Sequence, residues 1–223
     1  MKLINYYPVF LNLKDKICVV IGGGKVAERK IKSLLDCEAH IKLISPEITE
    51  DLKKLWQEKK IEWEQRKYKE GDLKGAFLVI AATSDKEVQK KIFKEAEERR
   101  IFCNVVDVPE LCTFIVPSVI RRGELCIAIS TSGASPALSR RIREKLEKEF
   151  SPSWEHHLKL IRHIRQEVLS SNLSPEEKEK KLTQFAFVPF YIYFERKEID
   201  LIESILKKEN ISLPSWLKEG LNR

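Results

Sequence analysis

Residues 17–27, ICVVIGGGKVA, run from a stretch of β-branched and apolar residues directly into three glycines and a helix-forming segment. Short apolar runs of this kind are typical of buried strands, and the glycines with Ala27 form the pattern G-x-G-x-x-A at a turn from strand to helix. In that context the pattern is typical of a loop that binds a dinucleotide. The stretch therefore predicts a nucleotide-binding βα unit, although an ordinary glycine-rich turn shares its composition.

Each residue type in this loop has a physical reason. Gly22 allows the tight turn after the strand, and Gly24 lets the backbone approach a pyrophosphate. Ala27 lets the helix pack closely on the strand, and the free amide groups at the start of the helix attract phosphate oxygens. We therefore expect the loop to hold the phosphates of a dinucleotide.

Outward from this loop, apolar runs alternate with charged segments as far as residue 106. Further apolar runs occupy residues 41–44, 77–81 and 102–106, and the predicted helices occupy residues 25–35, 47–59 and 85–99. The runs are apolar on both faces, which is typical of parallel strands covered by helices on each side. We therefore predict a Rossmann-like, doubly wound α/β domain over residues 1–113.

The pattern changes after residue 113. Apolar residues at 114–116 and 119–120, a turn at 121–124 and an apolar run at 125–130 predict a β-hairpin. From Ser135 onward the chain is predicted to be helical, with an apolar stripe formed by Leu158, Ile161, Ile164 and Val168. We expect a hairpin and helix segment over residues 114–150 and a helical C-terminal domain over residues 151–223.

The composition bounds the class of protein. The 223 residues include 41 Lys and Arg against 34 Asp and Glu, and the net charge of +7 favours acidic small ligands over nucleic acid. No apolar run is long enough to cross a membrane, and the start does not resemble a signal peptide. The five cysteines lack C-x-x-C spacing, and His156 and His163 have no acidic or thiol partner between them. We therefore expect reduced thiols, a cytoplasmic location and no metal site.

Polar positions follow two of the predicted strands, at the edge where ligands bind in open α/β sheets. Glu47 comes two positions later than the acidic residue that usually holds the ribose, so it either reaches the ribose or lies in the first turn of the next helix. No arginine follows that strand to hold a 2′-phosphate, which favours NAD over NADP. Thr83 follows the strand 77–81, where small residues permit close approach of a cofactor and Ser84 or Asp85 can equally cap the next helix.

Asp107 closes the strand 102–106 at the same predicted edge. A carboxylate in this position can act as a general acid or base. Equally, Asp107 with Pro109 can form a simple turn, which is a common use of aspartate near proline. The residues alone leave both interpretations open.

The excess of basic over acidic residues is densest between residues 111 and 150, where seven basic side chains stand against four acidic ones. Ser135 and Pro136 predict the N-cap and first position of a helix. Ser132 and Ser135, together with Arg121 and Arg140, form a candidate site for carboxylates. A solvated helix face is the other interpretation of these charges.

Several separate segments resemble one protein family. They are GGGKVAERK at 22–30, AAT at 81–83, RIFCNVVD at 100–107, FIVPS at 114–118 and SGASPALSR at 132–140. In this order, and with YPVFL at 7–11, they are similar to the precorrin-2 dehydrogenase family, which includes the dehydrogenase module of siroheme synthase. The resemblance covers residues 6 to 150.

The resemblance implies that the chain oxidises precorrin-2 to sirohydrochlorin with NAD as hydride acceptor, a step toward siroheme and, in some organisms, cobalamin. It gives the serines and arginines above a purpose, because both tetrapyrroles carry many carboxylates. It also implies a homodimer whose subunit contact includes residues 114–150, with the last helices helping to enclose the tetrapyrrole. It places the functional aspartate at Asp107 and the cofactor contacts at Gly22, Gly23, Gly24, Lys25, Val26, Pro46 and Glu47, with Thr83 beside them.

The sequence departs from the family's pattern in places. Glu38 stands where relatives often end the first helix with glycine, residues 151–223 match only loosely, and no methyltransferase domain is expected. Some relatives also insert iron into sirohydrochlorin, so a bifunctional dehydrogenase and ferrochelatase that uses Asp107 in both steps is one alternative. A non-catalytic NAD-binding regulator is another, because one fold hosts many functions. We expect a dehydrogenase alone, with a separate chelatase as a partner and with no nucleic-acid or membrane partner.

Overall fold

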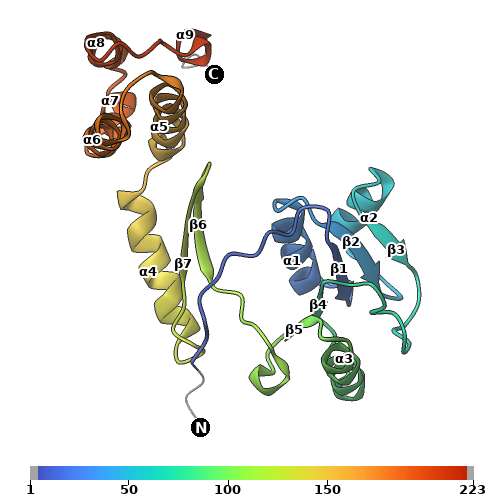
Figure 1. The fold of residues 1–223 in the computed structure, drawn as a ribbon. Helices are drawn as coiled ribbons and strands as arrows, with labels where there is room; N and C mark the ends of the chain where they lie inside the picture. Colours follow the sequence, from blue (N-terminus) through green and yellow to red (C-terminus); the bar gives the residue numbers. More distant parts are fainter. Residues whose placement is uncertain (1–4, 220–223) are drawn as a thin grey trace. The chain divides into compact units, whose positions relative to one another are not determined.

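The computed structural model describes residues 5–219 and divides into two compact units, Met1–Val116 and Pro117–Arg223 (Figure 1). The first four and last four residues, which the predicted domain ranges include, lie outside the described residues. The first unit contains the predicted α/β sheet, and the second contains the hairpin and the remaining helices.

The first unit is built on a five-stranded parallel sheet with the order β3-β2-β1-β4-β5. Its strands are β1 (Ile17–Ile21), β2 (His40–Ile44), β3 (Glu62–Glu64), β4 (Leu78–Ala81) and β5 (Phe102–Val105). The last residue of β1, Ile21, pairs with Ile44 of β2 and with Ala81 of β4. The predicted doubly wound α/β fold is therefore confirmed, and the direction of winding reverses between β1 and β4.

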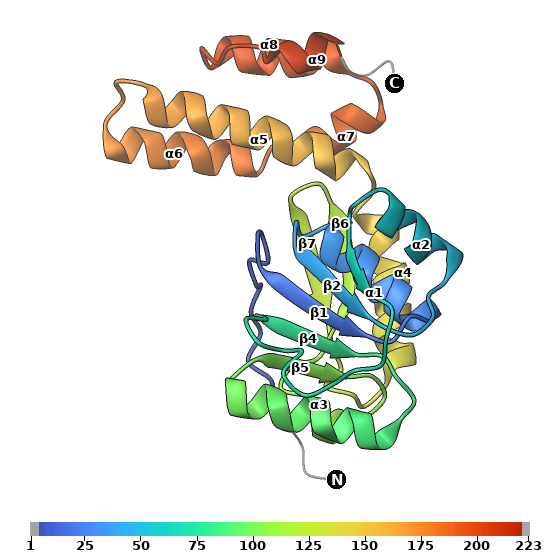
Figure 2. The same ribbon diagram turned by 90° about the vertical axis from the view of Figure 1, so that its right-hand side faces the viewer.

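Helices cover both faces of this sheet (Figure 2). Alternate residues of β1 belong to different apolar clusters: Cys18 and Val20 pack with the α1 and α2 side chains, whereas Val19 and Ile21 pack with those of α3. The helices are α1 (Lys25–Leu35), α2 (Glu50–Gln57), α3 (Lys86–Arg99) and the short 3₁₀ helix η1 (Pro109–Leu111). Burial on both faces explains the continuous apolar runs in the sequence.

The helix after β2 begins later than predicted. Thr49 is the N-cap of α2, because its side chain accepts a hydrogen bond from the amide of Leu52. The helix therefore starts at Glu50, and the expectation that Glu47 could lie in its first turn is wrong. Of the two candidate caps of α3, Ser84 and Asp85, Asp85 is the cap, since its side chain accepts from the amides of Glu87 and Val88.

The second unit begins with the predicted antiparallel hairpin of β6 (Ser118–Arg122) and β7 (Leu125–Ile129). Helix α4 (Pro136–Glu149) packs on this hairpin, and Ser135 caps it as predicted by accepting from the amide of Leu138. Arg122 donates from Nε to the carbonyl of Phe150 at 2.8 Å. This bond ties the hairpin to the end of the helix.

The rest of the second unit is helical and has its own core. The helices are α5 (Ser153–Ser170), α6 (Pro175–Ala186), α7 (Phe190–Glu195), α8 (Ile199–Lys208) and α9 (Ser215–Glu219). Three residues of the predicted apolar stripe of α5 are confirmed, because Ile164 and Val168 are buried in this core and the half-buried Ile161 packs against it. Leu158 is only half-buried, and His157 and Leu160 lie on the buried face instead. That face packs against α6 and α7. Among the described residues, no helix combines the length and the apolar composition that crossing a bilayer requires.

Candidate functional site

The glycine loop between β1 and α1 is held between two neighbouring strand ends. Gly22 has a φ of +108°, and a Cβ added there would lie 2.3 Å from the carbonyl oxygen of Ala82, which follows β4. Gly23 approaches the loop after β2 equally closely, because its added Cβ would lie 2.0 Å from the carbonyl oxygen of Glu47. At both positions the neighbouring backbone leaves no room for a side chain. Glycine is thus required at position 23 for close packing, although the G-x-G pattern allows any residue there.

Gly24 differs from the other two glycines. It is the N-cap of α1 with an extended backbone, and a Cβ added to it would meet no atom within 4 Å. Within residues 5–219, no side chain caps the amides at this helix start. Ala27 is fully buried in the first turn, so the helix lies close to the sheet. Open space in front of uncapped amides fits a phosphate group.

The loop after β2 lies directly against the glycines. The Thr49 amide donates to the Gly23 carbonyl at 3.1 Å, and the Ser45 hydroxyl donates to the Glu47 carbonyl at 2.6 Å. The indole of Trp63 on β3 donates to the Ser45 carbonyl at 2.9 Å. This bonding leaves Pro46 and the Glu47 side chain exposed beside the glycine loop.

Thr83 lies at the same edge of the sheet. The amide of Ala82 donates to the Ile21 carbonyl at 2.7 Å, which places the end of β4 beside the start of the glycine loop. The buried side chain of Gln89 on α3 donates to the Thr83 carbonyl at 2.7 Å. Gln89 therefore fixes the backbone at Thr83, a role that nothing in its local sequence indicates.

Asp107 follows the end of β5, one strand further along. The Val106 amide donates to the Ala81 carbonyl at 3.0 Å, so the Asp107 turn adjoins the end of β4. Asp107 is exposed and has a φ of +63°, a conformation that favours glycine or asparagine. Among the described residues no cation lies within ion-pair distance of its carboxylate. The parallel strands thus bring the glycine loop, Thr83 and Asp107 to one edge of the sheet.

Two charged side chains of α1 were not singled out from the sequence. Lys30 is half-buried, and burial and the charge of Arg29 lower its pKa against the opposing influence of Asp107 and Cys112. Lys30 is therefore a cation within electrostatic reach of Asp107. Its only signal in the sequence is its place in the segment GGGKVAERK.

Glu28 is a buried carboxylate that joins α1 to α2. It accepts from Lys25 and Lys32, both at 2.9 Å, and from the Thr49 hydroxyl at 2.7 Å. These hydrogen bonds, led by that from Lys25, lower its pKa from 4.5 to about 2. Because the Lys25 ammonium is paired with Glu28, Lys25 offers the site its backbone amide.

In the second unit, the predicted serines lie in a loop organised by Thr131. The Thr131 hydroxyl accepts from the Ser135 amide and donates to the Ser135 carbonyl, both at 3.0 Å. Ser132 is exposed and has a φ of +51°. The Ser135 hydroxyl is engaged as the cap of α4. Thr131 is thus the residue that shapes this loop.

The arginines of this unit fall into different groups. Arg122 is structural, as its bond to Phe150 shows. Arg140 is paired with Glu144 at 2.7 Å, which is a weak interaction on an exposed helix face. Arg121 and Arg141 are exposed and have no acidic partner within ion-pair distance among residues 5–219.

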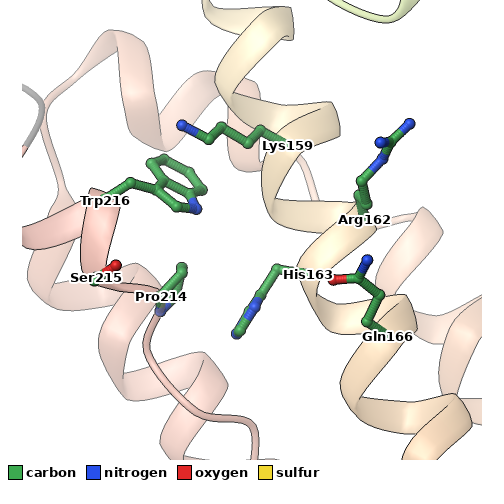
Figure 3. A pocket seen from close by; sticks show the side chains of 7 residues that line it. All are labelled: Lys159, Arg162, His163, Gln166, Pro214, Ser215 and Trp216. Atoms are coloured by element: carbon green, nitrogen blue, oxygen red, sulfur yellow. The ribbon is translucent and has the colours of Figure 1, made fainter.

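Residues of α5 and residues 214–216 line an open cavity of about 360 Å³, and none of the predicted site residues lines it (Figure 3). The Lys159 ammonium lies 4.4 Å from the centre of the Trp216 ring, and Nε2 of His163 lies 2.7 Å from the Ser212 carbonyl oxygen. Arg162, which also lines the cavity, is paired with Glu124. Within the described part of the chain, no group of three His, Cys, Asp or Glu side chains is arranged to hold a metal ion.

Comparison with known proteins agrees with the division of the chain into two units. Residues 9–118 match the family model described as "Putative NAD(P)-binding", and residues 122–149 match the model described as "Sirohaem biosynthesis protein central". The first unit is therefore a domain of the type that binds a nicotinamide cofactor.

Individual relatives point to the same family. The siroheme synthase of Methylobacillus flagellatus is 44% identical over 140 residues, which are 63% of this chain and 30% of the relative. That of Vesicomyosocius okutanii is 37% identical over 175 residues, which are 78% of this chain and 38% of the relative. The chain thus matches about a third of the length of these relatives.

A solved structure extends the similarity to nearly the whole chain. SirC, a precorrin-2 dehydrogenase, is similar with a TM-score of 0.77 and 28% identity, over 91% of this chain and 100% of SirC. Together, the two family models, the siroheme synthases and this structure show that the chain belongs to the family of precorrin-2 dehydrogenase and the corresponding module of siroheme synthase.

Proposed function

We propose that this chain is an NAD-dependent precorrin-2 dehydrogenase that produces sirohydrochlorin in siroheme biosynthesis. The observation that carries the proposal is the juxtaposition of Asp107 with the open glycine loop at one edge of the sheet, in a chain similar to SirC over 91% of its length. A nucleotide-binding regulator needs the loop but has no use for an exposed carboxylate at the same edge of the sheet.

The proposed roles follow from the chemistry of the oxidation, which removes a hydride and a proton from the substrate. The amides of Gly24, Lys25 and Val26 would hold the pyrophosphate, and the Glu47 carboxylate would accept hydrogen bonds from the ribose hydroxyls. When bound, the nicotinamide cofactor supplies the acceptor for the hydride. The exposed Asp107 carboxylate takes up the proton as a general base.

NAD is favoured over NADP by the charges beside β2. Glu47 presents a carboxylate where a 2′-phosphate would bring negative charge. The nearby Arg66 is held by both oxygens of Asp72, each at 2.8 Å, and is also paired with Glu64. Its guanidinium is therefore already satisfied by carboxylates.

Ser132, Ser135, Arg121 and Arg140 remain our candidates for binding the substrate's carboxylates. Arg121 is the stronger of the two arginines, because Arg140 is paired with Glu144. We also infer a homodimer through the hairpin segment, where Val119 and Leu138 are 39% and 48% exposed. Sedimentation as a 26.0 kDa monomer at micromolar concentration would contradict the dimer.

The role of Asp107 is tested by Asp107→Asn. Asparagine tolerates a positive φ at least as well as aspartate, so the variant should fold and bind NAD with an unchanged Kd. Loss of the base should lower kcat by about 100-fold or more. Asp36→Asn, at the exposed C-cap of α1, is the matched control and should keep full turnover. Full turnover in Asp107→Asn would remove this aspartate from the mechanism.

A further inference from the structure

The turn that presents Asp107 has a left-handed backbone conformation at that residue. The Val108 amide donates to the Val105 carbonyl at 3.2 Å, which closes a four-residue turn. Asp107 occupies the third position of that turn with a φ of +63°. Turns of this kind favour glycine or asparagine at that position. Aspartate also tolerates this conformation, and hydrogen bonds from outside the turn would hold it in one geometry.

A thiol provides this support. Sγ of Cys112 lies 3.2 Å from the Val105 carbonyl oxygen and 3.3 Å from that of Val108, the residues at the two ends of the turn. A thiol has one proton, so the two carbonyls share it in a three-centre hydrogen bond. Helix η1 reverses the direction of the chain, so that Cys112 lies against the turn. Its thiol then contacts both ends of the turn.

The sulfur is itself held in place by β5. The side chain of Asn104 is buried and donates to Sγ of Cys112 at 3.6 Å and to the Phe114 carbonyl at 3.0 Å. Asn104 and Cys112 also form an isolated antiparallel bridge. Next to them, the Thr113 amide donates to the Cys103 carbonyl at 2.8 Å. The thiol therefore occupies a fixed position between the sheet and the turn.

We propose that Cys112 is a positioning residue that holds the Asp107 turn, and with it the direction of the Asp107 carboxylate, through the hydrogen bonds of its thiol to the carbonyls of Val105 and Val108. The inference rests on the proposed role of Asp107 as the base. It predicts that the thiol acts as a hydrogen-bond donor, with no part for it as a nucleophile or metal ligand.

The environment of the thiol agrees with a donor. Burial raises the pKa of Cys112, so the thiol keeps its proton at neutral pH. A protonated thiol donates weakly, and a serine hydroxyl can replace it as a donor, whereas alanine cannot. Comparing Cys112→Ser with Cys112→Ala therefore distinguishes the effect of the hydrogen bond from the effect of removing the sulfur.

The test compares these two variants with a control, Cys37→Ala. Cys37 is a half-buried thiol that follows the C-terminal end of α1. In Cys112→Ala we expect kcat for precorrin-2 oxidation to fall about threefold to tenfold, with the Kd for NAD unchanged. Hydrogen exchange of the Val108 amide should accelerate by a similar factor, because that amide closes the turn. Cys112→Ser should return both quantities close to those of the wild type, and Cys37→Ala should change neither.

Two results would overturn the proposal. One is an unchanged Val108 exchange rate and unchanged kcat in Cys112→Ala. The other is a loss of kcat that Cys112→Ser does not restore, which would mean that the size of the sulfur matters and its proton does not. The exchange measurement needs no substrate. If the wild-type chain failed to oxidise precorrin-2, the proposed function would fall while the exchange rates still decided the role of the thiol.

Discussion

The three consecutive glycines of the loop have three different physical roles. Gly22 and Gly23 lack a Cβ because the carbonyl oxygens of Ala82 and Glu47 occupy the space that it would need. Gly24 has no such neighbour and faces open space at the start of α1. The first two glycines thus serve the fold, and the third leaves room for the cofactor.

Gly24→Val is therefore expected to separate binding from folding. The free energy of unfolding should fall by no more than about 1 kcal/mol, because valine is a poorer N-cap than glycine but its Cβ meets no atom within 4 Å. The Kd for NAD should rise more than about tenfold, since the side chain would stand where the pyrophosphate approaches. Isothermal titration and urea unfolding check the two effects.

Gly23→Ala is the matched control for this variant. Its Cβ would lie 2.0 Å from backbone, so it should lower the free energy of unfolding by several times as much as Gly24→Val. Normal NAD affinity in a folded Gly24→Val protein would contradict the assignment of the loop.

Glu38 illustrates a cost in stability at a single residue. It closes the turn after α1 with a φ of +57°, a conformation that favours glycine, and its exposed ion pair with Lys14 contributes little. Glu38→Gly should raise the free energy of unfolding by about 0.5–1 kcal/mol, because relief of the left-handed strain outweighs the added chain entropy. Urea unfolding measures the change.

Glu58→Gly supplies the opposite expectation. Glu58 is the C-cap of α2 with an ordinary φ of −74°, so glycine there relieves no strain and should destabilise the protein. Equal effects of the two substitutions would show that backbone conformation does not decide the outcome at Glu38.

At the scale of the element, α1 links the cofactor loop to the rest of the first unit. Its buried Glu28 carboxylate is bonded to Lys25 and Lys32 and to Thr49, the N-cap of α2. Thr49 in turn donates its amide to Gly23. The helix, the glycine loop and the start of α2 are therefore one bonded assembly.

The stability supplied by Glu28 should depend on pH in a defined range. Its folded-state pKa of about 2 lies below the ordinary 4.5, so the stabilisation is fully present above pH 4.5 and is lost as the pH falls toward 2. Urea midpoints of the wild type and Glu28→Gln should therefore differ most at pH 6 and approach each other by pH 3. A difference that stays constant with pH would contradict the role of this carboxylate.

Elements with strong local signals were predictable from the sequence, and elements defined by tertiary contacts were not. The strand β1 and its loop were evident because burial on both faces requires continuous apolar residues. The edge strand β3 was missed, since it has three residues and none of them is fully buried. The start of α2 was misplaced because Thr49 is identified as its cap only by the bond it accepts from Leu52.

The same distinction holds for the candidate site. The positions of Gly24, Glu47 and Asp107 relative to strand ends could be inferred, because parallel strands align their carboxyl ends. The contributions of Gln89 and Cys112 depend on side chains that reach back across the fold. No local pattern in the sequence identifies such residues.

For the whole molecule, the order of the strands determines where the site lies. Winding reverses between β1 and β4, and ligands of open α/β sheets bind outside the carboxyl ends of the strands at such a point. The glycine loop, Thr83 and Asp107 all lie at these ends. The siroheme synthases that resemble this chain are about three times as long as the part that matches. The activity of the matched part must therefore be measured on this chain itself.

The most direct measurement is an anaerobic assay of the purified protein with precorrin-2 generated in place. NADH and sirohydrochlorin absorbance are followed with NAD⁺ or NADP⁺, and Fe²⁺ is added after oxidation is complete. The account predicts that NADH and sirohydrochlorin form in equal amounts, faster with NAD⁺, and that iron insertion does not exceed the protein-free control. Binding of NAD without any oxidation of precorrin-2 would contradict the account and favour a regulator, and accelerated iron insertion would show a bifunctional enzyme.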